Sequence, residues 1–206
     1  GIKAWNTHTS QSSGFMGAID GGGHTVYGVY VKSGTYSGLI GNVVGPTKVS
    51  DLHVKNSYVY GKCVGGIIGS AYGANTNLEV TRCSVDNVVV ECKGRSDRGV
   101  RVAGIVGGGE STGKITVSNC STTNATIKSH HSGYPGIESG ILGYIGAAGH
   151  TVTNCFVDDS AHPLSNATNE AHFTTNMGNN VTYSNVYYIR NANDTRAFLA
   201  TNAKEA

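Results

Sequence analysis

Three segments of the sequence, 93–101, 129–138 and 158–180, carry polar and aromatic side chains of the kinds that recognise ligands. An aromatic ring surrounded by forked donors and carboxylates suits a sugar, whose hydroxyl groups need both donors and acceptors. We therefore expect a glycan or a protein to bind here, with Tyr134 as a stacking platform; ordinary solvated loops are the alternative. The side chains that we expect to contact the ligand are Arg95, Arg98, Arg101, His130, His131, Tyr134 and Glu138.

Metal binding and catalysis are the other kinds of chemistry that these segments suggest. His130 and His131 could ligate a metal with His162 or His172, but adjacent residues on an extended segment point in opposite directions. Paired-cysteine and HExxH spacings are absent. No Asp-x-Asp pair lies on an expected strand, although enzymes that cleave polysaccharides use closely spaced carboxylates. We therefore expect no metal, no cofactor and no catalytic residue, and keep a polysaccharide-cleaving lyase or glycoside hydrolase as the alternative.

The composition favours short strands joined by tight turns. The 206 residues include 30 glycines and 3 prolines, and only 14% of the residues are charged. Scattered basic residues and a formal net charge of +2 give no nucleic-acid footprint. No apolar run approaches the roughly 20 residues that a membrane helix needs. A signal peptide is not visible at Gly1 and no closing element is visible at Ala206, so we expect a fragment of a longer protein.

A glycine–apolar–apolar–glycine tetrad recurs four times, at 38–41, 66–69, 104–107 and 140–143. The starting glycines are 28, 38 and 36 residues apart, so the second and third intervals carry insertions. These insertions are the segments 93–101 and 129–138, and the segment 158–180 leaves the following repeat at the matching point. Loops that leave equivalent points of stacked repeats lie beside one another, so we expect the three segments to form one corner.

A second pattern, Val-x-polar-apolar-x-apolar, follows each tetrad, and weaker copies occur at 26–31 and 183–188. Its polar residue suits a bend that turns both apolar positions inward, and equivalent positions of stacked parallel strands form interior rows. The first row is expected to contain Val26, Val49, Val80, Val117, Val152 and Tyr183. The second row is expected to contain Val29, Leu52, Cys83, Cys120, Cys155 and Val186.

The remaining cysteines leave an alternative open. Cys83, Cys120 and Cys155 read as small buried hydrophobic residues. Cys63 and Cys92 lie about one repeat apart and could form a disulfide if their Cα atoms approach within about 7 Å. Five reduced cysteines are the favoured interpretation.

The tetrads resemble the GLUG motif, and the segment 15–26 looks like the stretch that often precedes GLUG arrays. The resemblance covers roughly residues 14–157. Such arrays occur in large secreted or wall-attached bacterial proteins, including adhesins and accessory regions of immunoglobulin-cleaving metallopeptidases. The resemblance implies an extracellular or cell-surface location and a binding or spacer role, with no catalytic residues to transfer.

Taken together, these patterns predict an all-β chain folded as a right-handed parallel β-helix, a solenoid of about six coils in one domain, 1–206. Its expected parts are a glycine-rich lead-in at 14–31, repeats at about 38–65, 66–103, 104–139 and 140–180, and a degenerate last rung at 181–190. We expect a non-catalytic adhesion or spacer module that binds a glycan or a cell-surface protein, beside flanking domains of a larger chain and without a membrane span. A minor alternative is ice binding by an outward Thr/Ser face, which Lys48 and Glu79 interrupt.

Overall fold

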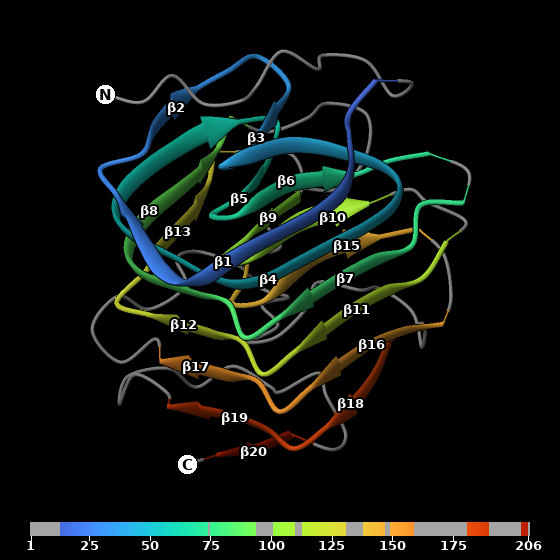
Figure 1. Ribbon diagram of the computed structural model, residues 1–206. Helices are drawn as coiled ribbons and strands as arrows, with labels where there is room; N and C mark the ends of the chain where they lie inside the picture. The colour runs from blue at the N-terminus through green and yellow to red at the C-terminus, as the bar shows by residue number, and fades with distance from the viewer. Residues whose placement is uncertain are drawn as a thin grey trace.

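The protein is an all-β molecule with a parallel sheet that nearly closes on itself (Figure 1). The computed structural model describes residues 13–73, 75–93, 101–109, 113–130, 138–146, 149–158, 181–189 and 203–205. Helix does not occur among these residues. The described part of the chain therefore offers no helical segment of the length and apolarity that crossing a membrane requires.

Successive turns of the chain lay their strands side by side, and every strand pair among the described residues is parallel. The pairs form five ladders. The first ladder contains β1 (Phe15–Tyr27), β4 (Ile40–Gly61), β7 (Leu78–Thr81), β11 (Ile115–Ser118), β16 (His150–Thr153) and β18 (Val181–Ser184). The second ladder contains the later parts of β1 and β4. It continues with β8 (Ser84–Cys92), β12 (Ser121–Thr123), β17 (Phe156–Asp158), β19 (Val186–Ile189) and β20 (Ala203–Glu205).

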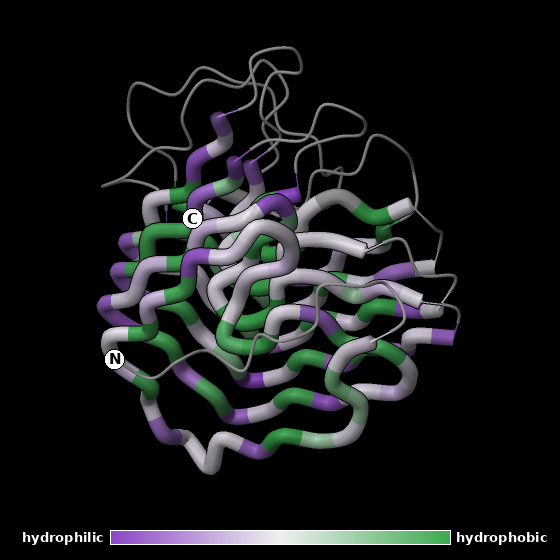
Figure 2. Tube along the Cα trace, turned by 90° about the horizontal axis from the view of Figure 1, so that it is seen from above, coloured by the Kyte–Doolittle hydropathy of each residue, from purple (hydrophilic) through white to green (hydrophobic). Residues whose placement is uncertain are grey.

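The other three ladders complete each turn. The third joins the ends of β4 and β8 to β2 (Tyr30–Lys32) and β13 (Thr126–Ser129). The fourth is a separate sheet of β3 (Tyr36–Ser37), β5 (Cys63–Gly65), β9 (Arg101–Ala103) and β14 (Glu138–Ser139). The fifth joins the start of β4 to β6 (Ile68–Ala71), β10 (Val106–Gly109) and β15 (Leu142–Ile145). Seen from above, the chain winds around an interior (Figure 2).

Single residues in the left-handed conformation turn the chain between ladders. Left-handed φ is tolerated best by glycine, asparagine and aspartate, which explains why these types dominate the bends. Between the first and second ladders, φ lies between 50° and 55° at Asp51, Arg82, Asn119, Asn154 and Asn185. Between the second and third, it lies between 50° and 65° at Gly28, Asn56, Asn87 and Asn124. These bends return both apolar rows to the interior, as the sequence pattern predicts.

Side chains at the bends bond from one turn to the next. The side-chain amide of Asn154 donates to Asn119 Oδ1, and the side-chain amide of Asn185 donates to Asn154 Oδ1, both over 3.2 Å. At the two preceding bends of the same column, the Arg82 guanidinium donates two hydrogen bonds of 2.6 Å to the Asp51 carboxylate. The bends thus carry hydrogen-bonded columns along the stack.

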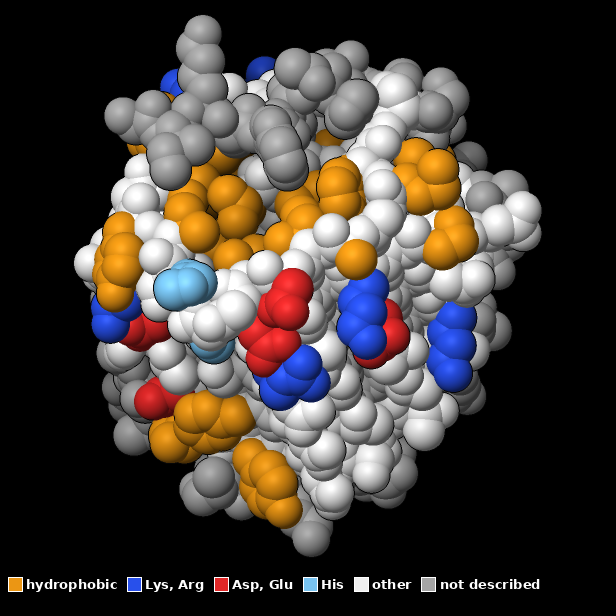
Figure 3. Space-filling model, viewed as in Figure 1, with side chains coloured by type: hydrophobic (Ala, Val, Ile, Leu, Met, Phe, Trp, Pro, Cys, Tyr) orange, Lys and Arg blue, Asp and Glu red, His pale blue; other side chains and the backbone are white. Residues whose placement is uncertain are grey.

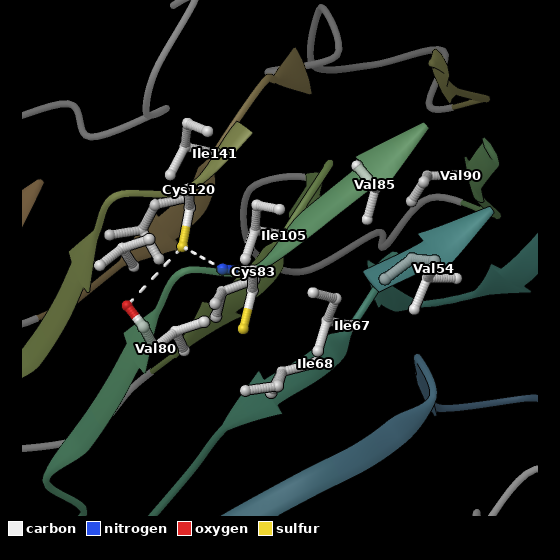
Figure 4. Packing of buried hydrophobic residues seen from close by; sticks show 14 of the residues in the cluster. Val54, Ile67, Ile68, Val80, Cys83, Val85, Val90, Ile105, Cys120 and Ile141 are labelled. Atoms are coloured by element: carbon white, nitrogen blue, oxygen red, sulfur yellow. Dashed lines mark hydrogen bonds between the residues drawn. The ribbon is translucent and has the colours of Figure 1, made fainter. Parts of the chain in front are cut away.

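The predicted interior column of cysteines is confirmed. Cys83, Cys120 and Cys155 are at most 2% exposed, and the Cys83 amide lies 3.4 Å from Cys120 Sγ (Figure 4). Their strands are in register, because the Ser121 amide donates to Cys83 O and the Phe156 amide to Cys120 O. Hydrogen bonds from the neighbouring thiols, together with burial, raise the pKa of the Cys120 thiol far above its ordinary value. The same hydrogen bonds lower the pKa of the Cys83 and Cys155 thiols. The three side chains act as small apolar groups because all of them are buried in the core.

The tetrad glycines let two ladders approach each other closely. A Cβ added at Gly107 would lie 2.4 Å from the Val64 carbonyl oxygen and 2.5 Å from that of Gly69. These oxygens belong to β5 of the fourth ladder and β6 of the fifth. Only glycine fits such backbone contact, so the tetrads set the spacing between the fourth and fifth ladders.

The expected register of the 26–31 copy is wrong. Val26 pairs with Val54, and Ile19 instead pairs with Val49 in the first ladder. The physical reason is an irregularity in β1 between Asp20 and His24, where extra residues shift the pairing with β4 by two positions. The assignment of Val29 to the second row fails with it, because the Val29 amide donates to Ser57 Oγ at the start of the third ladder.

Cys63 and Cys92 lie on different ladders. Cys63 pairs with Arg101 in the fourth ladder, and Cys92 pairs with Gly61 in the third. Both side chains are fully buried thiols rather than disulfide partners, and Cys92 Sγ donates to the Lys62 carbonyl oxygen over 3.0 Å. The favoured interpretation of reduced cysteines agrees with this arrangement.

Candidate functional site

The outward side of the third ladder gathers aromatic and charged side chains. Along this ladder Val31, Val59, Val90 and Ile127 point inward and are buried. Alternation along a strand therefore turns their sequence neighbours outward. We call this outward surface the tyrosine face, and its members are Tyr30, Lys32, Tyr58, Tyr60, Glu91, Lys128 and His130. His130 directly follows β13 and joins the face through its bond to Glu91.

Two stacked tyrosines form the upper part of the face. Tyr30 and Tyr58 are paired in register, and their rings stack with centroids 5.3 Å apart and planes 21° apart. Tyr30 is 61% exposed. Beside this pair, Lys32 Nζ lies 5.5 Å from the centre of the Tyr60 ring, a cation–π contact. The stack holds the Tyr30 ring in place while leaving much of it open to solvent.

A hydrogen-bonded chain continues from the stack toward β13. The Tyr58 hydroxyl donates to Glu91 Oε2 over 2.6 Å, and Glu91 Oε1 bonds to His130 Nε2. The bond from Tyr58 holds the pKa of Glu91 below its usual range. In turn, the bond to Glu91, with desolvation and the negative charge there, raises the pKa of Tyr58 to about 12. At neutral pH the face therefore presents a neutral phenol and an ionised carboxylate.

The structure places three of the predicted ligand contacts. His130 belongs to the tyrosine face and is exposed. Arg101 and Glu138 are fully buried, not solvent-exposed as loop residues would be, because β9 and β14 begin at these residues. Glu138 Oε1 accepts a bond of 2.7 Å from the Ser129 amide, which ties the two ends of the intervening segment together.

Arg101 has its own contact in the interior. Its guanidinium carbon lies 5.9 Å from the centre of the Tyr72 ring. Arg101 and Glu138 lie on neighbouring strands of the fourth ladder. That they contact a ligand stays a prediction, and Arg95, Arg98, His131 and Tyr134 lie outside the described residues.

The residues of the face that sequence reasoning missed carry a recognisable signal. Tyr58-Val59-Tyr60 begins two residues after the bend at Asn56, and Tyr30-Val31-Lys32 begins two residues after the bend at Gly28. Alternation after a bend residue could have assigned the tyrosines to an outward surface. As for metals, no group of three or more His, Cys, Asp or Glu side chains suited to one ion occurs among the described residues.

Comparisons with known proteins bear on the fold. No protein-family model matches the sequence, and no curated protein matches it. The chain is similar to a crystal structure from Bacteroides ovatus of a protein provisionally named an immunoglobulin A1 protease. The TM-score is 0.51 at 15% sequence identity, and the match covers 100% of this chain and 67% of the other. At this identity the likeness concerns the fold alone.

Proposed function

We propose that this chain is a non-catalytic binding module of a larger bacterial surface protein and that it binds a glycan at the tyrosine face. In this proposal the five ladders are the sides of a right-handed parallel β-helix of about six coils, built from GLUG-type repeats. The parallel stacking and the glycine contacts at the tetrads support the repeat assignment. The likeness to the Bacteroides ovatus structure supports the fold.

The single observation that carries the glycan proposal is the Tyr30 ring stacked on Tyr58 next to a bonded carboxylate. A sugar ring packs its apolar C–H face on an aromatic ring and uses its hydroxyl groups for hydrogen bonds. Because the stack already fixes Tyr30, binding costs little further side-chain entropy. Glu91 and His130 lie on the same surface and supply polar groups for the hydroxyls.

A rigid spacer and a protein ligand fit the same architecture. The spacer role follows from nearest-neighbour stacking, since a solenoid extends with each added turn. The tyrosine face favours a glycan over a protein, because its open aromatic surface is small and edged by charged groups. A catalytic alternative would use the Tyr58–Glu91–His130 chain, since these groups could exchange a proton with a bound sugar.

The test measures binding and cleavage separately. The wild-type chain is titrated with neutral oligosaccharides of glucose, galactose, mannose and xylose, by calorimetry and by ligand-observed NMR. For those that bind, Tyr30→Ala should weaken affinity at least about tenfold, as is typical of a buried aromatic contact. Tyr27→Ala is the matched control, because Tyr27 is also 61% exposed but lies on β1, outside the tyrosine face.

Three outcomes contradict the proposal. If none of these neutral sugars binds at millimolar concentration, the glycan role of the tyrosine face is wrong. Equal losses in Tyr30→Ala and Tyr27→Ala would place the ligand elsewhere. Release of new reducing ends by the wild type, abolished by Glu91→Gln, would make the chain an enzyme.

A further inference from the structure

A groove crosses the outside of the first ladder, on a different side of the molecule from the third. Its volume is about 450 Å³, within the range of small-molecule sites. Strands β4, β7 and β11 form its floor, where Leu78 is buried and Pro46 is exposed. Its polar lining consists of Thr47, Lys48, Asn77, Glu79, Lys114 and Thr116.

The charges in this groove do not balance. Lys48 Nζ pairs with Glu79 Oε1 over 3.2 Å, and both side chains are about half exposed. Paired blue and red side chains of this kind are visible on the face of the molecule in Figure 3. Lys114 is exposed and forms no ion pair with any residue in the described part of the chain. Two ammonium groups and one carboxylate leave the lining with one positive charge.

The hydrogen-bonding groups of the groove are mostly donors. Asn77 Oδ1 accepts a bond of 2.9 Å from the Lys114 amide, which fixes the side-chain amide by its oxygen. The Asn77 NH₂ group is therefore left to donate. The lysine ammonium groups can only donate, and Glu79 is the only carboxylate among the lining residues. A ligand that satisfies this set has hydroxyl groups and one negative charge.

We propose that this groove binds an anionic sugar unit, a uronate or a sulfated sugar. Its charged group pairs with Lys114, Asn77 donates to it, and Glu79 accepts from a neighbouring hydroxyl. Lys48 stays with Glu79 and orients the carboxylate. This site is independent of the tyrosine face, because the two surfaces lie on different ladders and share no residue.

The experiment titrates the whole chain with three probes of similar size. They are a galacturonate trisaccharide, its uncharged methyl ester, and a sulfated galactose trisaccharide. Both anionic probes should bind at least about fivefold more tightly than the ester, a preference that shrinks as salt rises, since exposed charges are screened. The tighter of the two anionic probes identifies the source of the charge.

Two variants move affinity in opposite directions. Lys114→Ala should weaken binding of the anionic probes about fivefold, the loss of one charged hydrogen bond discounted for solvent exposure. Glu79→Gln removes the negative charge and releases Lys48, so it should tighten the binding of these probes. Lys62→Ala is the control, since the Lys62 side chain is exposed, forms no ion pair with a described residue, and lies outside the groove.

Any of three results overturns the groove site. The ester could bind as tightly as the anionic probes, Lys62→Ala could match Lys114→Ala, or Glu79→Gln could weaken binding. Tyr30→Ala should leave the affinity of the anionic probes unchanged. If Tyr30→Ala weakens the binding of neutral sugars but not of the anionic probes, the two sites are separate, and failure of one proposal can be told from failure of the other.

Discussion

Substitution of Gly107 by alanine tests the close packing of the fourth and fifth ladders. An added Cβ would lie 2.4 Å from Val64 O, 2.5 Å from the Val64 carbonyl carbon and 2.5 Å from Gly69 O. Non-bonded carbon contacts are favourable at about 3.5–4.0 Å, so these atoms must retreat by roughly 1 Å. All of them are backbone atoms of paired strands, and no side chain can rotate away to relieve the contact.

The expected cost has two parts. Overpacking of this kind costs about 1–3 kcal/mol, and displacing β5 or β6 weakens about two ladder hydrogen bonds worth about 1 kcal/mol each. The free energy of unfolding should therefore fall by about 3–5 kcal/mol. For a chain of this size, about 2–4 °C of melting temperature accompanies each kcal/mol, so the melting temperature should drop by roughly 6–20 °C.

The assay is thermal unfolding followed by circular dichroism, with chemical denaturation to measure the free energy. Gly34→Ala is the control, because an added Cβ at Gly34 meets no atom within 4 Å. Its free energy of unfolding should stay within about 0.5 kcal/mol of the wild type. A Gly107→Ala variant that melts as the control does would refute the close approach of the fourth and fifth ladders.

Two further predictions concern the interior column and the tyrosine face. Cys120→Asp should lower the free energy of unfolding by several kcal/mol, because it places a carboxyl group without a charge partner in the core; an unchanged denaturation midpoint would contradict the buried column. The Tyr58 phenol should ionise near pH 12, and Glu91→Gln should move its pKa toward 10, as followed by the ultraviolet absorbance of tyrosinate. Because the folded pKa of Tyr58 is raised, its contribution to stability is fully present below pH 10 and is lost as pH rises through 12. The pKa of Glu91 is lowered, so its contribution is present above about pH 4.5 and is lost as pH falls below that value.

The interior of the fold could be predicted from the sequence because its rows repeat locally. Val49, Val80 and Val117 recur at the same distance before a polar bend residue, and any stacking of the repeats aligns them. The same argument placed Cys83 and Cys120 in one column. The argument failed for Val26, because the irregularity in β1 arises where β1 pairs with β4. It cannot be recognised from the spacing of apolar residues in the sequence.

The candidate site was harder to predict. Arg101 and Glu138 look like solvated loop residues in the sequence, but each begins a strand whose side chains face the interior. The members of the tyrosine face come from β2, β4, β8 and the end of β13, where His130 directly follows the strand. Only the register therefore brings Tyr30 to Tyr58 or Glu91 to His130. The register of the third ladder in turn depends on the bends at Gly28, Asn56, Asn87 and Asn124, which the sequence pattern did not include.

The parallel ladders also determine how the molecule would bear mechanical load. The hydrogen bonds between turns run along the stack, from β1 at one end to β20 at the other (Figure 1). Tension along this direction opposes one turn's bonds at a time, because each turn contacts only its neighbours. The chain should then peel open stepwise at low force, each step releasing about one repeat. Force applied across the stack would instead shear many bonds together and meet much higher resistance.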